Sequence, residues 1–148
     1  MGALSEELVS IMTALRRVLR RRLRSTLPGA PLRGAQLELL QLVERQPGIG
    51  VAAAGRALHL AANSVSTLAT ELIDQGLLVR RSTPQDRRAA QLCLTPQATQ
   101  RLAAWRRARA ELVATALAAL ADADRQALVR ALPALRVLLA ALDTKEEG

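Results

Sequence analysis

Apolar side chains in the first third of the chain recur every three or four residues, the spacing that places them on one face of a helix. Such a face runs over residues 4–27, and a stretch rich in proline and glycine over 28–31 then breaks the pattern. The same spacing predicts a second helix over 33–45 and a short, alanine-rich third helix over 51–58. We therefore expect the chain to begin with three helices.

The middle of the chain changes from a helical to a strand-like pattern. A fourth helix is predicted to run from residue 62 or 63 to Gly76, because apolar residues again recur at intervals of three and four. Residues 77–81 and 90–94 are short apolar runs on either side of the polar, proline-containing segment 82–88. Two such runs predict a β-hairpin with 82–88 as its tip.

Two further helices are predicted in the C-terminal third. Thr95 and Pro96 are typical of an N-cap residue and the first residue of a helix, which apolar residues continue to Leu120. Asp122 and Asp124 interrupt the pattern, and the last helix then carries leucines at alternating spacings of four and three. This heptad-like seam comprises Leu128, Leu132, Leu135, Leu139 and Leu142. A seam of this kind needs a partner helix, and the predicted fold is mainly α (α+β).

Charge and composition narrow the class of protein. The 148 residues carry a formal net charge of +8, almost all of the positive charge is arginine, and this favours a polyanionic partner. The single cysteine, Cys93, excludes an intrachain disulfide, and Glu6 and Glu7 stand where a secretory signal has basic residues. Apolar runs are shorter than the roughly 18 residues that span a bilayer. We therefore expect one compact cytoplasmic protomer without a membrane partner.

Two short helices joined by a tight turn, then a glycine and a hairpin with a basic tip, are typical of a winged helix-turn-helix. In that arrangement the second helix enters the major groove of double-stranded DNA, and the hairpin, or wing, reaches the minor groove. The predicted recognition helix exposes Asn63, Ser64, Ser66, Thr67, Thr70 and Glu71. The predicted wing contacts are Arg87 and Arg88, which Asp86 orients. The alternative is that all of these are solvated residues and that Asn63 or Ser64 only caps its helix.

The hairpin and the helix before it resemble a known family. Residues 86–95, DRRAAQLCLT, are similar to the D-x-R…L-x-L-T wing signature of the MarR family of winged helix-turn-helix regulators. Residues 64–66, with the sequence SVS, and residues 76–81, with the sequence GLLVRR, look like the family's recognition helix and first wing strand. Length and helix order agree with the family as well.

The resemblance implies a homodimer whose N- and C-terminal helices interlock. The implied boundaries are a single protomer over 1–148, a DNA-binding region over 33–95, and dimerisation helices over 1–30 and 96–144. The implied shared core comprises Leu8, Ile11, Leu15, Leu132, Leu135, Leu139 and Leu142. Two wings then straddle a palindromic operator, and the implied function is sequence-specific regulation of transcription, most often repression.

The resemblance also implies an apolar or anionic small-molecule effector that binds between the dimerisation helices and the winged domain and releases the DNA. The chain has no Tyr or Phe, so only Trp105 is available to stack on a ligand; the alternative is a core or interface anchor. The short third helix departs from the family pattern. Ala54 and Gly55 replace a larger Leu-Ala pair, His59 stands where glycine usually ends the helix, and we expect loose packing there.

Other chemistries find little support in the sequence. His59 has no second histidine and no Cys-x-x-Cys motif to accompany it, so we expect a cap or surface residue and no metal site. No catalytic triad or phosphate-binding loop can be assembled, so we expect neither an enzyme nor a cofactor. Cys93 lies on the opposite face of its strand from Leu92 and Leu94, and it is either an inert thiol or a redox sensor.

Two alternatives to a specific regulator remain open. A non-specific architectural DNA-binding protein accounts for the positive charge equally well. The arginines between Arg16 and Arg24 line one side of the first helix and also suit an anionic membrane surface. Discrimination between DNA sequences and binding to anionic vesicles separate these alternatives from the regulator.

Overall fold

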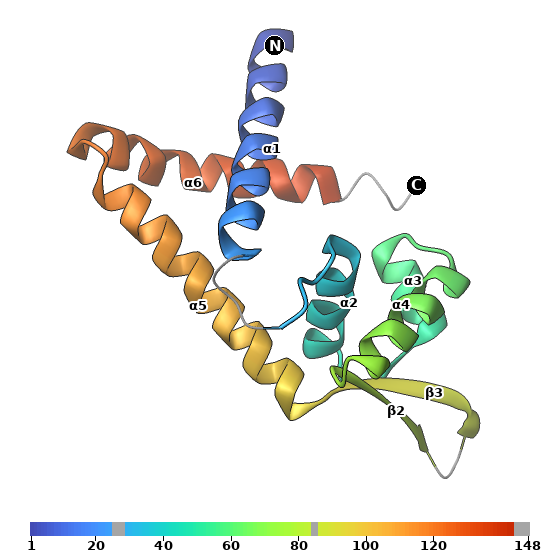
Figure 1. Cartoon of the computed structure of the whole chain (residues 1–148). Coiled ribbons are helices and arrows are strands. Elements are labelled where there is room, and N and C mark those ends of the chain that lie inside the picture. The colour runs from blue at the N-terminus through green and yellow to red at the C-terminus, as the bar shows by residue number, and fades with distance from the viewer. Residues whose placement is uncertain (25–28, 84–85, 144–148) are drawn as a thin grey trace. The chain divides into compact units, whose positions relative to one another are not determined.

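The chain forms six helices and three strands over the residues that the computed structural model describes, which are 1–24, 29–83 and 86–143. In chain order they are α1 (Gly2–Arg24), α2 (Gly34–Arg45), β1 (Ile49–Gly50), α3 (Val51–Leu58), α4 (Ala62–Asp74), β2 (Leu78–Thr83), β3 (Asp86–Leu94), α5 (Pro96–Ala118) and α6 (Asp122–Asp143) (Figure 1). The predicted mainly α (α+β) winged-helix fold is confirmed. The chain divides into two compact units, Met1–Arg109 and Ala110–Gly148.

The sheet of the first unit contains one strand more than the sequence predicts. Its order is β1-β3-β2, both pairings are antiparallel, and β1 pairs Ile49 with Leu92 and Gly50 with Gln91. Two residues are too few to show the alternation by which a strand is found in a sequence. The two long strands also extend into 82–88, which was wrongly expected to be a tip, because Thr83 pairs with Asp86 after an irregularity between Arg81 and Thr83.

The core of the first unit lies between α2, α4 and the sheet. Its fully buried members include Leu39, Leu40, Val43, Val65, Ala69, Leu72, Leu77, Leu78, Leu92, Ala98 and Leu102. Burial of each large aliphatic side chain contributes about 1.5–3 kcal/mol, so this core fixes which face of α4 remains accessible.

The short helix α3 packs tightly, and the expectation of loose packing is wrong. Ala54 and Gly55 are buried, and a Cβ atom on Gly55 would lie 2.7 Å from the backbone oxygen of Leu60. The turn that follows therefore requires glycine at this position. His59 is the C-cap residue, with φ 52° and ψ 41°, and its side chain is exposed, as predicted.

Thr95 joins the wing to the next helix in the predicted way. Its hydroxyl accepts a hydrogen bond from the Ala98 N–H (3.1 Å), which is the N-cap interaction, and donates one to the Gly76 carbonyl (2.7 Å). An N-cap side chain satisfies a backbone donor that the first turn of a helix leaves unpaired. The second bond ties the end of β3 to the turn after α4.

The second unit holds the end of α5 and the whole of α6. The Arg125 guanidinium donates to the carbonyl oxygen of Leu120 (2.7 Å) and forms an ion pair with Asp122. The same guanidinium also donates to the carbonyl oxygen of Ala118 (3.3 Å), the last residue of α5. The last carbonyl groups of a helix have no partner within it. On α6 the seam leucines are exposed in the single chain.

Candidate nucleic-acid interface

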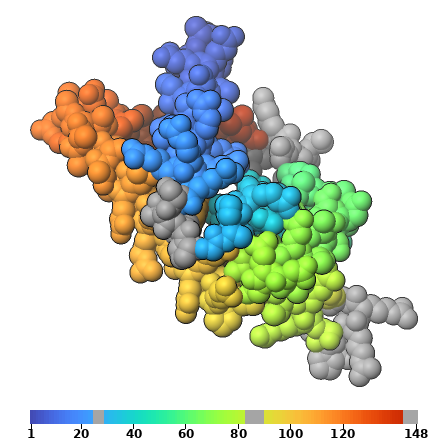
Figure 2. Space-filling model, viewed as in Figure 1, coloured from blue at the N-terminus to red at the C-terminus, as the bar shows by residue number. Residues whose placement is uncertain are grey.

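The outer face of α4 carries the small polar residues that the sequence assigns to recognition. Asn63, Ser64, Thr67 and Thr70 are exposed and Ser66 is half-buried. The opposite face holds the fully buried Val65, Ala69 and Leu72. The green surface in Figure 2 includes α4 and β2. The structure therefore places all five predicted recognition residues on one helix and holds that helix by its apolar side.

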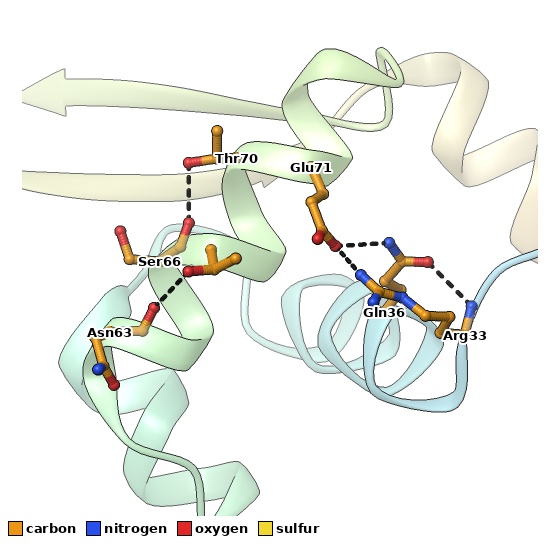
Figure 3. Close-up of polar contacts among 7 residues, drawn as sticks. Arg33, Gln36, Asn63, Ser66, Thr70 and Glu71 are labelled. Carbon is orange, nitrogen blue, oxygen red and sulfur yellow. Dashed lines mark hydrogen bonds and ion pairs between the residues drawn. The ribbon is translucent and has the colours of Figure 1, made fainter.

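Hydrogen bonds within α4 determine what these side chains offer to a partner. The Thr67 hydroxyl donates to the Asn63 carbonyl (3.0 Å), and the Thr70 hydroxyl donates to the Ser66 carbonyl (2.9 Å) (Figure 3). A hydroxyl has one hydrogen and two lone pairs, so both threonines present acceptor oxygens to the outside. Such oxygens match the amino groups that cytosine and adenine display in the major groove.

Asn63 is not the N-cap of α4. The N-cap position is held by Ala61, without a side-chain hydrogen bond, and Asn63 follows inside the first turn. Its Oδ1 atom accepts a hydrogen bond from the Ser64 N–H (2.8 Å). The Asn63 side chain thus satisfies one exposed backbone donor, which supports part of the alternative interpretation, and its amide nitrogen remains on the outer face.

Glu71 belongs to a contact between α4 and α2 and not to the outer face, where the sequence placed it. Its carboxylate forms an ion pair with Arg33 and accepts a hydrogen bond from Gln36 Nε2 (3.0 Å), and Gln36 is buried (Figure 3). Gln36 Oε1 in turn accepts from the Arg33 N–H (3.0 Å). The hydrogen bonds from Arg33 and Gln36 lower the pKa of Glu71, because they stabilise its charged form.

The wing is described only in part. The backbone of Asp86, Arg87 and Arg88 belongs to β3, but their side chains lie outside the described part of the structure, so the predicted contacts stay predictions. The structure adds a residue that the sequence analysis missed. Arg80 of β2 places its Nη2 atom 3.5 Å from both Ser66 Oγ and Thr70 Oγ1.

A cavity of about 250 Å³ lies within the first unit, between α1, α2 and the first half of α5. Its apolar lining includes Leu19, Leu23 and Trp105, and Trp105 is half-buried. Its cationic lining comprises Arg16, Arg20, Arg24, Arg101 and Arg109.

Three of these arginines have defined contacts. Arg16 forms an ion pair with Glu38 (3.2 Å), which also lines the cavity. The Arg109 guanidinium lies 4.3 Å from the centroid of the Trp105 ring, and Arg101 donates to the Ala30 carbonyl. Partial burial lowers the pKa of Arg101, because burial disfavours the charged form. The cavity therefore combines an aromatic wall with five arginines and one carboxylate, that of Glu38.

The predicted dimer residues are found in both units. In the first unit Ile11 and Leu15 are exposed and Leu8 is half-buried; in the second, Leu132, Leu135, Leu139 and Leu142 are 41–68% exposed. Large aliphatic side chains lose favourable free energy when they face water. The single chain thus leaves these predicted interface residues uncovered.

The remaining expectations concern single residues and absences. Cys93 is half-buried between the buried Leu92 and the half-buried Leu94. Among the described residues, no three potential metal-binding side chains come together. None of the helices in the described ranges has an apolar stretch long enough to cross a bilayer.

The predicted DNA-binding region is similar to a known family. Residues 30–89 match the model of the MarR family. A curated protein of Thauera aromatica, named as a transcriptional regulatory protein for the hcr operon, is 32% identical over 91 residues. The match covers 62% of this chain and 55% of that relative. This chain therefore spans little more than half of the relative's length.

Solved structures share the fold over nearly the whole chain. A protein described as a transcriptional regulator of Pseudomonas aeruginosa is 28% identical, with a TM-score of 0.79 and coverage of 92% of this chain and 93% of that one. RV1404 of Mycobacterium tuberculosis is 19% identical, with a TM-score of 0.81 and coverage of 94% and 93%. A mutant of S. aureus MepR bound to an oligodeoxyribonucleotide is 19% identical, with a TM-score of 0.70 and coverage of 91% and 96%.

Proposed function

We propose that this chain is a sequence-specific DNA-binding regulator of transcription of the MarR family, whose model residues 30–89 match, and that it is not an enzyme. The observation that carries the proposal is the outer face of α4, where the acceptor oxygen of Thr67 lies beside Asn63, Ser64 and Ser66. Small side chains allow the helix backbone to approach base edges closely. A mutant of S. aureus MepR that shares this fold was solved bound to an oligodeoxyribonucleotide, which supports DNA as the partner.

We propose that two copies act together. The exposed leucines of α6 and the exposed residues of α1 would cover one another in a homodimer. Two recognition helices then meet half-sites about one helical turn apart, which is the geometry of a palindromic operator. Occupation of such a site blocks transcription, and repression is the sign of regulation that we propose. The cytoplasmic location stays a prediction.

We propose that the cavity in the first unit binds the effector. A flat apolar body fits beside Trp105, and an anionic group fits among the arginines. Pro31, Leu32 and Gly34 line the cavity and flank Arg33, which holds Glu71 of α4. A ligand that shifts this segment changes the support of the recognition helix. The protein then has two states, one that binds DNA well and one that binds it poorly. The factor by which the ligand lowers DNA affinity cannot exceed the ratio of its own affinities for these two states.

The decisive experiment is a fluorescence-anisotropy titration of the purified protein with DNA from the region flanking its own gene and with scrambled DNA of equal length. A preference of about a thousandfold for the flanking DNA is expected of a specific regulator. Equal, salt-sensitive binding to both duplexes contradicts the proposal and favours the architectural protein. Anionic vesicles form a third arm, and binding to vesicles alone supports a membrane function.

Substitutions in the recognition helix and in the wing are expected to have different effects on DNA binding. Thr67→Ala removes an acceptor of the major-groove surface and should reduce discrimination against scrambled DNA by about 1 kcal/mol. Arg88→Ala should weaken binding to both duplexes and lower the salt dependence, because it removes a charge near the phosphates. Anisotropy over a salt series measures both effects. Unchanged binding by both variants contradicts the assignment of the site.

The effector proposal can be tested through Trp105, the single tryptophan of a chain without tyrosine. Intrinsic fluorescence therefore reports on the cavity directly. Small aromatic carboxylates are expected to change this fluorescence and to release bound DNA, whereas their uncharged amides bind at least about tenfold more weakly because they lack the ionic contact. Equal binding of the two series contradicts an anion site. Binding without release of DNA contradicts the regulatory role.

A further inference from the structure

The recognition helix lacks a positive charge of its own. Residues 62–74 contain no Lys or Arg, and they contain two acids, Glu71 and Asp74. Double-stranded DNA presents a dense row of phosphates on both sides of the major groove. A helix that enters this groove without a cation depends on neighbouring elements for its attraction to the backbone, and the described structure offers Arg80 at this place.

Strand alternation explains why Arg80 reaches α4. In an antiparallel pair, directly opposite residues point to the same side of the sheet. Arg80 pairs with Leu92 and lies two residues after Leu78, and both leucines are buried against the helices. Arg80 therefore continues the inner face of β2 at the point where the core ends. Its neighbour Arg81 points to the opposite face.

The guanidinium of Arg80 lies over the outer face of α4 beside two hydroxyl groups. Its Nη2 atom is 3.5 Å from Ser66 Oγ and 3.5 Å from Thr70 Oγ1. The Thr70 hydrogen is directed to the Ser66 carbonyl, so a Thr70 lone pair faces the guanidinium. These contacts are at the outer limit of a hydrogen bond. They orient the group but leave most of its five donors available, and no carboxylate of the described residues pairs with Arg80.

We propose that Arg80 binds a phosphate of the DNA backbone at the edge of the major groove, with Ser66 and Thr70 as positioning residues. The proposal rests on the proposed function, because it assumes that α4 faces DNA. The position along the helix favours a phosphate over a base. Residues near the N-terminus of a recognition helix contact base edges, whereas Thr70 lies in the second half of α4. A bidentate guanidinium suits a phosphate there.

Arg80→Gln and Arg81→Gln form a matched pair for the test. Both remove one positive charge from an exposed residue of β2, but only Arg80 lies over α4. The probes are the flanking and the scrambled duplex, titrated over a series of salt concentrations. Arg80→Gln is expected to weaken binding to both duplexes by about tenfold and to lower the slope of log K against log salt by about 0.9.

The other variants and outcomes complete the test. Arg80→Lys should restore the slope but not the full affinity, because lysine keeps the charge and loses the bidentate geometry. An unchanged slope in Arg80→Gln, or equal losses in Arg81→Gln, overturns the proposal. A loss confined to the flanking duplex assigns Arg80 to a base and also overturns it. Failure of the wild-type protein to prefer the flanking duplex contradicts the proposed function separately, since the salt slope remains measurable on scrambled DNA.

Discussion

Leu135→Glu is expected to convert the proposed dimer into monomers and to lower affinity for a duplex with two half-sites on the order of 100-fold. Leu135 lies in the leucine seam of α6 and is 41% exposed in the single chain. A carboxylate at this position would have to lose its water in an apolar interface, which is costly without a partner. A monomer also loses the gain that comes from tethering the second recognition helix near its half-site.

Val137→Glu is the matched control for this variant. Val137 is 70% exposed and lies outside the seam, and residues two apart on a helix do not share a face. The Val137→Glu substitution introduces the same charge into the same helix and should leave both dimerisation and DNA affinity unchanged. Analytical ultracentrifugation and anisotropy measure the two properties together. A Leu135→Glu variant that is monomeric but binds DNA fully would contradict the proposed dimeric architecture.

The recognition face could be predicted from sequence because it depends on local periodicity. The apolar positions of Val65, Ala69 and Leu72 determine which side of α4 is buried, and the polar residues between them then lie outside. Glu71 departs from that prediction. It lies on the border of the two faces, and its orientation follows from Arg33 and Gln36, more than thirty residues away.

Arg80 and β1 were missed for different reasons. Arg80 stands in a basic run beside Arg81, and only the pairing of β2 with β3 shows which of the two points to α4. The strand β1 consists of two residues whose pairing partners lie about forty positions later in the chain. In a helix or strand longer than one repeat of the apolar pattern, the sequence shows which face is buried. It does not show which distant helix or strand packs against that face.

Gly55→Val is expected to lower the stability of the protein strongly, because Gly55 packs against the tight turn between α3 and α4. The backbone oxygen of Leu60 lies 2.7 Å from the position of a Cβ atom on Gly55, and the Leu60 N–H donates to the Gly55 carbonyl (2.9 Å). A carbon and an oxygen atom without a bond between them approach to about 3.3 Å, so the Leu60 backbone would have to move by roughly 0.6 Å. Overpacking of this kind costs about 3 kcal/mol, which chemical denaturation measures.

The displacement also connects this turn to recognition, because α4 begins at Ala62, two residues after Leu60. Gly55→Val should therefore lower DNA affinity even where the variant is still fully folded. Gly50→Val is the control, since a Cβ atom on Gly50 meets no atom within 4 Å and its backbone at φ −79° is open to any residue. A Gly55→Val variant as stable as the control would contradict the predicted cost of overpacking, because the Leu60 backbone would then move without loss of stability. Normal stability with weakened DNA binding would instead locate the whole effect in the position of α4.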